Sequence, residues 1–179
     1  MRSRASRWSP AIVVLHWINA ALILALLALG WVMTHSPFGA GTTFDLYQQH
    51  KSLGFAALAL TALRLAARLA SAAPARVSGW EGLVARAVQA AFYVLTLAAI
   101  AAGWLVVSAS PLPVPTKFFG LIVIPNIAPP DATLFALGVL AHWIAAYAIA
   151  ALVALHVAGA LKHHWIDRDD TLKRMLPRR

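Results

Sequence analysis

The 179-residue sequence contains no cysteine. Disulfide bonds, thiolate metal sites and the Cys-x-x-Cys-His attachment of a covalent c-type haem are therefore excluded. Charge is also scarce, because only 12% of the residues are charged whereas about 25% is usual for a soluble domain. Hydrophobic residues make up 61% of the chain. This composition excludes an ordinary soluble domain and favours a membrane protein.

Four apolar segments are long enough to cross a membrane, which takes roughly 20 residues of helix. They predict helices over about 11–33, 46–69, 83–108 and 132–164. The second segment is the weakest, because Lys51, Arg64 and Arg68 interrupt it. Long basic side chains near helix ends can reach back to the interface, so we count it as a span. The expected fold is all-α, an integral membrane four-helix bundle formed by one domain over residues 1–179.

The basic residues are distributed unequally between the two ends of the predicted bundle. Thirteen of the 15 Lys and Arg residues precede the first helix, flank the connection between the second and third, or follow the fourth. The positive-inside rule therefore predicts that the N-terminus, the loop 70–83 and the C-terminus are cytoplasmic, and that connections 35–45 and 110–131 face outward. Topology and contact with anionic lipid account for the net charge of +9, so no nucleic-acid partner is expected.

The outward connection between the third and fourth helices contains the apolar stretch Phe118–Pro125. This stretch is too short to span a membrane. It is expected to lie on the outer membrane surface or to cap the bundle.

Four of the seven histidines lie inside predicted spans, where an ionisable group usually faces the bundle interior and has a partner. His142 and His156 are 14 residues apart, so they share one helix face at depths about 21 Å apart. His16 lies near the cytoplasmic start of the first helix, and His50 near the outer end of the second. The predicted topology therefore pairs His16 with His156 in the inner half and His50 with His142 in the outer half.

Two imidazoles that face each other across a bundle suit the axial positions of a haem iron. Zinc would need about four ligands, and no cysteine or carboxylate lies at these depths. A proton relay would normally recruit Asp or Glu, and the predicted spans hold neither. Gly54 and Gly159, each about one turn after a histidine, could admit a flat macrocycle or could serve ordinary helix packing. The four histidines thus predict two non-covalent haems, and they are themselves the predicted iron ligands.

Arg64 follows His50 by 14 residues, the same offset that separates the histidines of the fourth helix. It should therefore reach the level of the inner pair, where it could bind a haem propionate. The alternative is an interface anchor whose charge reaches toward the lipid headgroups.

The chain resembles the prokaryotic cytochrome b561 family over nearly its whole length. The resemblance is carried by Leu15-His16-Trp17, by His50-Lys51-Ser52-Leu53-Gly54, by Phe118-Phe119-Gly120-Leu121 and, most specifically, by Ala154–His164 continuing through Asp167–Asp169 to Leu172–Pro177. It implies two b-type haems, electron exchange with quinone, and a place in the bacterial inner membrane. One branch is a superoxide oxidase, which passes electrons from superoxide at the outer surface to ubiquinone.

The resemblance also implies roles for several cations. Lys51 and Lys117 are the outward cations that could attract superoxide, although Lys117 is better explained as a solvated loop residue. The candidates for the propionate or quinone end are Arg64, Arg7, His163 and His164, the last two of which could instead lie among lipid headgroups. Two other functions remain open: a cytochrome b relay between the quinone pool and a protein partner such as a dehydrogenase or hydrogenase, and a non-redox carrier or scaffold.

Overall fold

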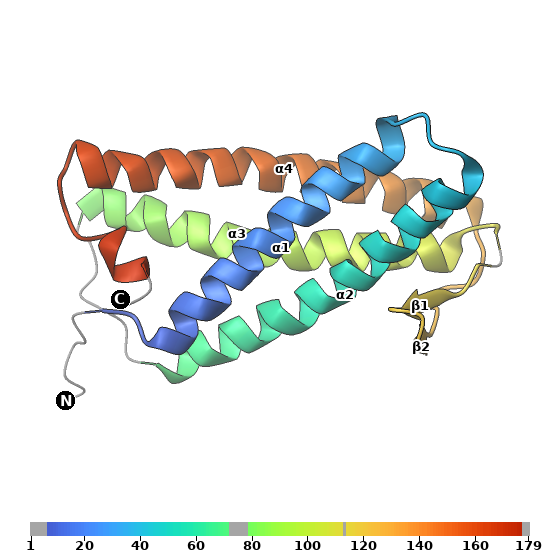
Figure 1. The fold of residues 1–179 in the computed structure, drawn as a ribbon, viewed down its shortest axis with the longest axis horizontal. Helices are drawn as coiled ribbons and strands as arrows, with labels where there is room; N and C mark the ends of the chain where they lie inside the picture. The colour runs from blue at the N-terminus through green and yellow to red at the C-terminus, as the bar shows by residue number, and fades with distance from the viewer. Residues whose placement is uncertain (1–6, 72–78, 113, 177–179) are drawn as a thin grey trace.

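The computed structural model describes residues 7–71, 79–112 and 114–176. Four long helices run along the longest axis of the molecule (Figure 1). They are α1 (Pro10–His35), α2 (Ala40–Ala70), α3 (Gly79–Ala109) and α4 (Ala132–Trp165). Strands β1 (Thr116–Phe118) and β2 (Ile122–Ile124) and the short 3-10 helix η1 (Lys173–Met175) complete the fold. All four long helices are apolar enough to cross a membrane, which confirms the predicted four-helix membrane fold.

Two helices begin earlier than the sequence predicts. Helix α2 begins at Ala40 rather than near 46, so Asp45 belongs to the helix and not to the outward connection. Helix α3 begins at Gly79 rather than near 83 and therefore includes Glu81. Hydropathy detects only the part of a helix that lies in lipid, whereas backbone hydrogen bonding continues into the polar turns beyond it. These helices are thus longer than the hydrocarbon layer requires.

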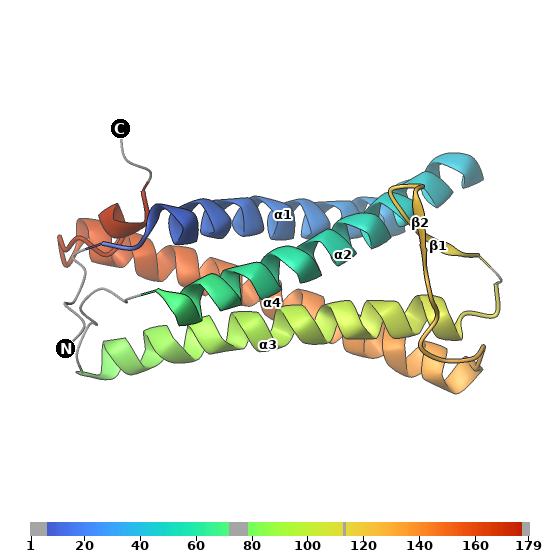
Figure 2. The same cartoon turned by 90° about the horizontal axis from the view of Figure 1, so that it is seen from below.

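The helices associate as two pairs, α1 with α2 and α3 with α4 (Figure 2). The second pair approaches closely at Gly138, where a Cβ atom would lie 3.1 Å from Val106 Cγ2 and 3.3 Å from its backbone nitrogen. Small residues permit such approach between membrane helices, which are held by packing rather than by a hydrophobic driving force. A small buried cluster of Ala99, Ala145 and Ile149 joins α3 to α4.

A buried amide connects α1 to α2. The side-chain nitrogen of Asn19 donates to the carbonyls of Leu15 (3.0 Å) and Leu60 (3.3 Å), while the Thr61 hydroxyl donates to the Asn19 oxygen (3.2 Å). Asn19 is only 2% exposed, so an unpaired amide there would be costly. These bonds fix how far α1 is shifted along α2, and hence the level of His16 three residues earlier.

The apolar stretch in the outward connection forms a β-hairpin. Thr116 pairs with Ile124, Lys117 with Val123 and Phe118 with Ile122. The turn contains Phe119 and Gly120 with φ of 47° and 77°, the positive values that tight hairpin turns require. Figure 1 shows this hairpin at the end of the bundle opposite to η1.

Beyond α4, residues 166–176 turn back across the other end of the bundle, and we call them the C-terminal hook. The indole N–H of Trp17 donates to the Met175 carbonyl (2.7 Å), and Arg7 donates to the Lys173 carbonyl. The hook therefore rests against the beginning of α1. Some residues used in the sequence argument lie outside the described residues. They are residues 72–78 of the loop 70–83, Pro177, and five of the counted basic residues, Arg2, Arg4, Arg76, Arg178 and Arg179.

Candidate functional site

The four histidines of the spans come together as two facing pairs. The ring centres of His16 and His156 are 6.2 Å apart, and those of His50 and His142 are 6.0 Å apart. Helix α4 supplies one histidine to each pair, and α1 and α2 supply the others. Because the two histidines of α4 are 14 residues apart, the pairs lie at depths about 21 Å apart.

The spacing within each pair fits an iron ion that binds one nitrogen of each ring. A bond of about 2 Å between a metal and an imidazole nitrogen, made on both sides of the metal, places the two ring centres roughly 6 Å apart. Direct hydrogen bonding would bring the rings closer, and none is recorded between the two members of either pair. The donor set of two neutral imidazoles is also the one that a b-type haem uses.

We name the pairs after the predicted topology: His50 and His142 form the outer pair, and His16 and His156 form the inner pair. The outer pair borders a cavity of about 860 Å³ lined by all four helices. That volume falls within the range of about 300–1,000 Å³ typical of pockets for small molecules and cofactors. Its walls are mostly apolar, and its polar residues include His50, His142 and Lys51. A flat, largely apolar macrocycle suits such a lining.

Helix α3 holds the ring of His142 in place although it supplies no histidine. The Nδ1–H of His142 donates to the Ala99 carbonyl at 2.7 Å, which leaves Nε2 as the nitrogen available to a metal. A Cβ atom at Gly103 would lie 3.1 Å from both Cε1 and Nδ1 of this ring. The glycine therefore makes room for the ring in that orientation.

His50 is accommodated in a similar way by α1. A Cβ atom at Gly30 would lie 3.4 Å from His50 Cε1, so this glycine also makes room for an imidazole. The Nδ1 atom of His50 is buried and has no hydrogen-bond partner among the described residues. Such a nitrogen beside a mostly apolar cavity is unusual, because buried polar groups nearly always have a hydrogen-bond partner.

The inner pair is surrounded by charged and aromatic groups. Arg64 donates to His16 Nδ1 at 2.9 Å, and its guanidinium lies 5.7 Å from the centre of the Tyr93 ring. Trp17 contacts His16 edge-on, and Phe92 contacts His156 in the same manner. Since arginine can only donate, a neutral His16 in this contact carries its proton on Nε2.

The other residues predicted to act at the two ends are arranged as follows. Lys51 borders the outer cavity next to His50, whereas Lys117 lies in β1. Arg7 binds the C-terminal hook, and His163 contacts aspartates of that hook. His164 has a buried Nδ1 without a partner among the described residues. Of these candidates for the inner end, only Arg64 has a recorded contact with a histidine of the inner pair.

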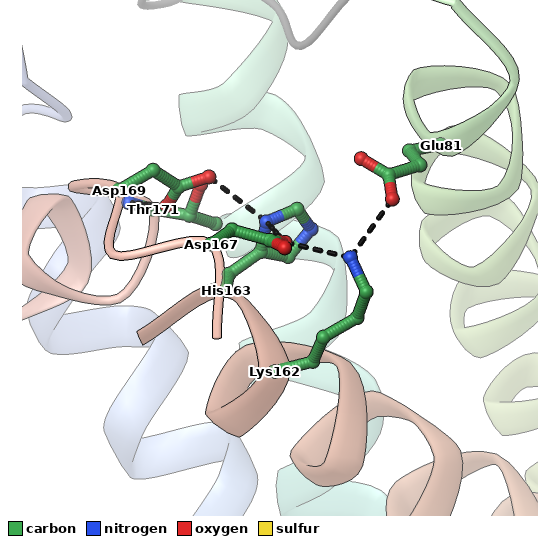
Figure 3. A network of polar contacts seen from close by, with 6 residues as sticks. All are labelled: Glu81, Lys162, His163, Asp167, Asp169 and Thr171. Atoms are coloured by element: carbon green, nitrogen blue, oxygen red, sulfur yellow. Dashed lines mark hydrogen bonds and ion pairs between the residues drawn. The ribbon is translucent and has the colours of Figure 1, made fainter. Parts of the chain in front are cut away.

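His163 belongs to a polar network that links α3, α4 and the hook (Figure 3). Lys162 Nζ lies 2.9 Å from Glu81 and 2.7 Å from Asp167, and His163 Nδ1 lies 2.8 Å from Asp169. Glu81, His163 and Asp167 are close enough together to hold a metal ion. The ammonium group of Lys162 already provides their positive charge, so the network is better explained as a set of ion pairs.

Within this network the hook is anchored by Asp169. Its carboxylate accepts from the backbone N–H of Thr171 at 2.7 Å and from His163. Partial burial acts to raise the pKa of Asp169, but these hydrogen bonds and the nearby His163 outweigh it and hold that pKa below the ordinary value. The charged form of Asp169 is therefore the one that stabilises the hook.

Sequence reasoning missed several residues that shape the pairs. Gly30 and Gly103 are single glycines in apolar helices. Such a glycine indicates that another group approaches the helix closely, but the sequence does not show that this group is a histidine ring. The sequence could not indicate the Ala99 carbonyl, because every residue has a backbone carbonyl. Gly54 and Gly159, which the sequence did indicate, have no neighbour within 4 Å of a Cβ atom, which is compatible with either role assigned to them.

Four helices that are long and apolar enough to cross a membrane define a multi-pass membrane protein. The model of the prokaryotic cytochrome b561 family matches residues 7–178. Cytochrome b561 homolog 2 of Escherichia coli (strain K12) is 33% identical over 175 residues, which cover 95% of this chain and 91% of the relative. Cytochrome b561 homolog 1 of the same organism is 28% identical over 177 residues, covering 97% and 99%.

The chain therefore belongs to the prokaryotic cytochrome b561 family. Members of this family are electron-transfer proteins that bind b-type haem. This membership, together with the four apolar helices, identifies a multi-pass protein of the bacterial inner membrane.

Proposed function

We propose that the protein holds two b-type haems and transfers electrons from superoxide on the outer side to ubiquinone on the inner side. The observation that carries this proposal is the presence of two facing histidine pairs, 6.0 and 6.2 Å between ring centres, at two depths of one bundle. His50 and His142 bind the outer haem, and His16 and His156 bind the inner haem. When bound, each haem supplies one-electron redox chemistry.

The chain's own groups prepare the ligands. The hydrogen bond from His142 to the Ala99 carbonyl orients its ring and makes Nε2 the basic nitrogen. At the inner pair, binding of iron through Nε2 of His16 requires the proton on Nδ1, where Arg64 now donates. Arg64 then needs another acceptor, and a haem propionate is the anion that suits a guanidinium.

At the outer end the substrate is a small anion, which positive charge attracts. Lys51 supports this role because it borders the outer cavity beside His50. Lys117 adds a second positive charge from the connection 110–131, whose hairpin is bonded to α2 one residue after Lys51. The cytoplasmic placement of both termini is part of the proposal, since it makes this end the periplasmic one.

At the inner end ubiquinone receives two electrons and two protons. The balanced reaction is 2 superoxide + ubiquinone + 2 protons → 2 oxygen + ubiquinol. His164 is the group best suited to bind a quinone oxygen, since its buried Nδ1 has no partner among the described residues. Arg64, at the inner pair, is the alternative if it does not bind a propionate. Arg7 and His163 support the same end indirectly, through the hook that they bind.

The activity is tested with purified protein in detergent, to which enzymatically generated superoxide and oxidised ubiquinone are added. We expect haem absorbance to show reduction by superoxide and ubiquinol to form in proportion. Haem reduction by a protein donor but not by superoxide would instead favour the relay between the quinone pool and a partner. Protein that is colourless after growth with adequate haem would exclude any redox function.

The ligand assignment is tested by replacing one histidine at a time. His142→Ala is expected to lose the outer haem and retain the inner one, because only the outer pair contains this ring. His16→Ala is expected to do the reverse. His35→Ala is the control, since His35 lies at the end of α1 outside both pairs, and should leave two haems per chain. Haem content by the pyridine haemochrome method distinguishes these outcomes, and equal loss of both haems in either variant would contradict the pairing.

A further inference from the structure

We propose that the β-hairpin, residues 116–124, is a membrane anchor that rests in the outer leaflet at the boundary between headgroups and acyl chains. Its partner is the lipid surface itself. This inference concerns how the outer end of the bundle is seated in the bilayer, and it does not depend on which donor or acceptor the protein uses.

The tip of the hairpin exposes large apolar side chains. Leu121 is 85% exposed, and Phe119, Ile122 and Val123 are each more than half exposed. Four such neighbours would form a costly patch if they faced water. On α2, the helix that holds the hairpin, Phe44 and Tyr47 are also exposed, as aromatic residues of a membrane interface usually are. The apolar tip therefore continues the lipid-facing surface of the helices.

The hairpin is fixed to α2 rather than loosely attached. The Ser52 hydroxyl donates to the Lys117 carbonyl and accepts from the Phe119 N–H, both at 3.0 Å. Gln48 donates to the Pro115 carbonyl at 3.4 Å. On the far side, the Trp104 indole of α3 donates to the Pro125 carbonyl at 2.9 Å. The connection thus crosses from α3 to α2 at the outer end, as Figure 2 shows.

Hydrogen bonding determines how deep the hairpin can lie. Ser52 of α2 forms hydrogen bonds with backbone groups along the edge of β1 that does not pair with β2. Among the described residues, the backbone groups on the opposite edge of the hairpin, in β2, have no such partner. Unpaired backbone groups are not tolerated in the hydrocarbon layer, although headgroups and water can satisfy them. The hairpin therefore belongs at the boundary, with its tip among the acyl chains and its free edge among the headgroups.

The position of the hairpin along α2 agrees with this depth. Helix α2 has 31 residues and is about 46 Å long, whereas the hydrocarbon layer is about 30 Å thick. Gln48 and Ser52 lie roughly 12–18 Å from the outer end of the helix. Lys117, opposite Val123 on the exposed face, can extend its ammonium group to a lipid phosphate.

The absence of cysteine makes a direct depth measurement possible. Leu121→Cys is labelled with a nitroxide, and the full chain is reconstituted in vesicles of phosphatidylethanolamine and phosphatidylglycerol. Val94→Cys on the exposed middle of α3 is the reference for the hydrocarbon layer. Gly41→Cys at the outer end of α2 is the aqueous reference, because its position has no neighbour within 4 Å. Collision with oxygen and with a water-soluble nickel chelate is measured by electron paramagnetic resonance.

We expect the label at Leu121 to collide with oxygen more often than the label at Gly41, and with nickel several-fold less often. Its depth should fall between the two references. Nickel collisions equal to those at Gly41 would place the hairpin in water and overturn the proposal. Protection from both reagents would also overturn it, because protein, including a second copy of the chain, would then cover the tip. Folding of each labelled variant is verified by helical circular dichroism and gel filtration.

Discussion

At the scale of single residues, the orientation of His142 depends on two neighbours from another helix. The Ala99 carbonyl accepts from its Nδ1–H, and Gly103 leaves space for the ring. The carbonyl determines which nitrogen keeps the proton, and the glycine determines where the ring can lie. An imidazole in a membrane helix is thus oriented by a backbone carbonyl and a glycine of a neighbouring helix.

Gly103→Ala is expected to weaken binding of the outer haem. The new Cβ atom would lie 3.1 Å from two atoms of the His142 ring, so the ring must shift, and the shift disturbs its bond to the Ala99 carbonyl. Loss of such an orienting bond typically lowers metal affinity by about 10–100-fold. Haemin titration followed by absorbance measures the affinity of each site. Gly41→Ala is the control and should change neither site, and unchanged outer affinity in the Gly103 variant would contradict this account.

At the scale of elements, the C-terminal hook connects α4 to the start of α1. His163 and Asp169 hold its beginning, while Trp17 and Arg7 bind its end. Arg168, with a φ of 53°, turns the chain between α4 and η1. Because Trp17 also contacts His16, the hook supports the side of the inner pair that faces the end of the bundle.

Asp169→Asn is expected to loosen the hook. The substitution removes a charged acceptor for His163 and Thr171, and such a hydrogen bond contributes about 1 kcal/mol, or roughly a 5-fold change in equilibrium. The measurement is the mobile fraction of a nitroxide at Leu176→Cys. Asp170→Asn is the matched control, because the Asp170 carboxylate pairs with the exposed Lys173 of the same hook. An equal mobile fraction in both variants would show that Asp169 does not hold the hook.

The same label reports the effect of pH. The pKa of Asp169 is lowered in the folded protein, so its contribution is fully present above the unfolded value of about 3.9. That contribution is lost as the pH falls through the lower, folded value. The mobile fraction should therefore stay constant on acidification to about pH 4 and rise below it. The Asn variant should lack this rise.

At the scale of the whole molecule, the direction of insertion decides which histidine pair faces the periplasm. The distribution of Lys and Arg predicts cytoplasmic termini. Asp170→Cys in the hook and Ile127→Cys in the outward connection provide one reporter for each side. A membrane-impermeant maleimide applied to intact spheroplasts should label Ile127→Cys, and label Asp170→Cys only after lysis. The opposite pattern would exchange the roles proposed for the two ends.

The sequence by itself determined the number of spans, the family and the two levels of the four histidines. Apolar runs and the 3.6-residue period are local properties, so they can be read without knowing which helices touch. Only the tertiary structure decided that α3 orients His142 through Ala99 and Gly103, that Ser52 holds an apolar hairpin, and that the hook returns to Trp17. These are contacts between backbone groups and side chains far apart in the chain. No local pattern encodes them, because each depends on how two helices approach and rotate against each other.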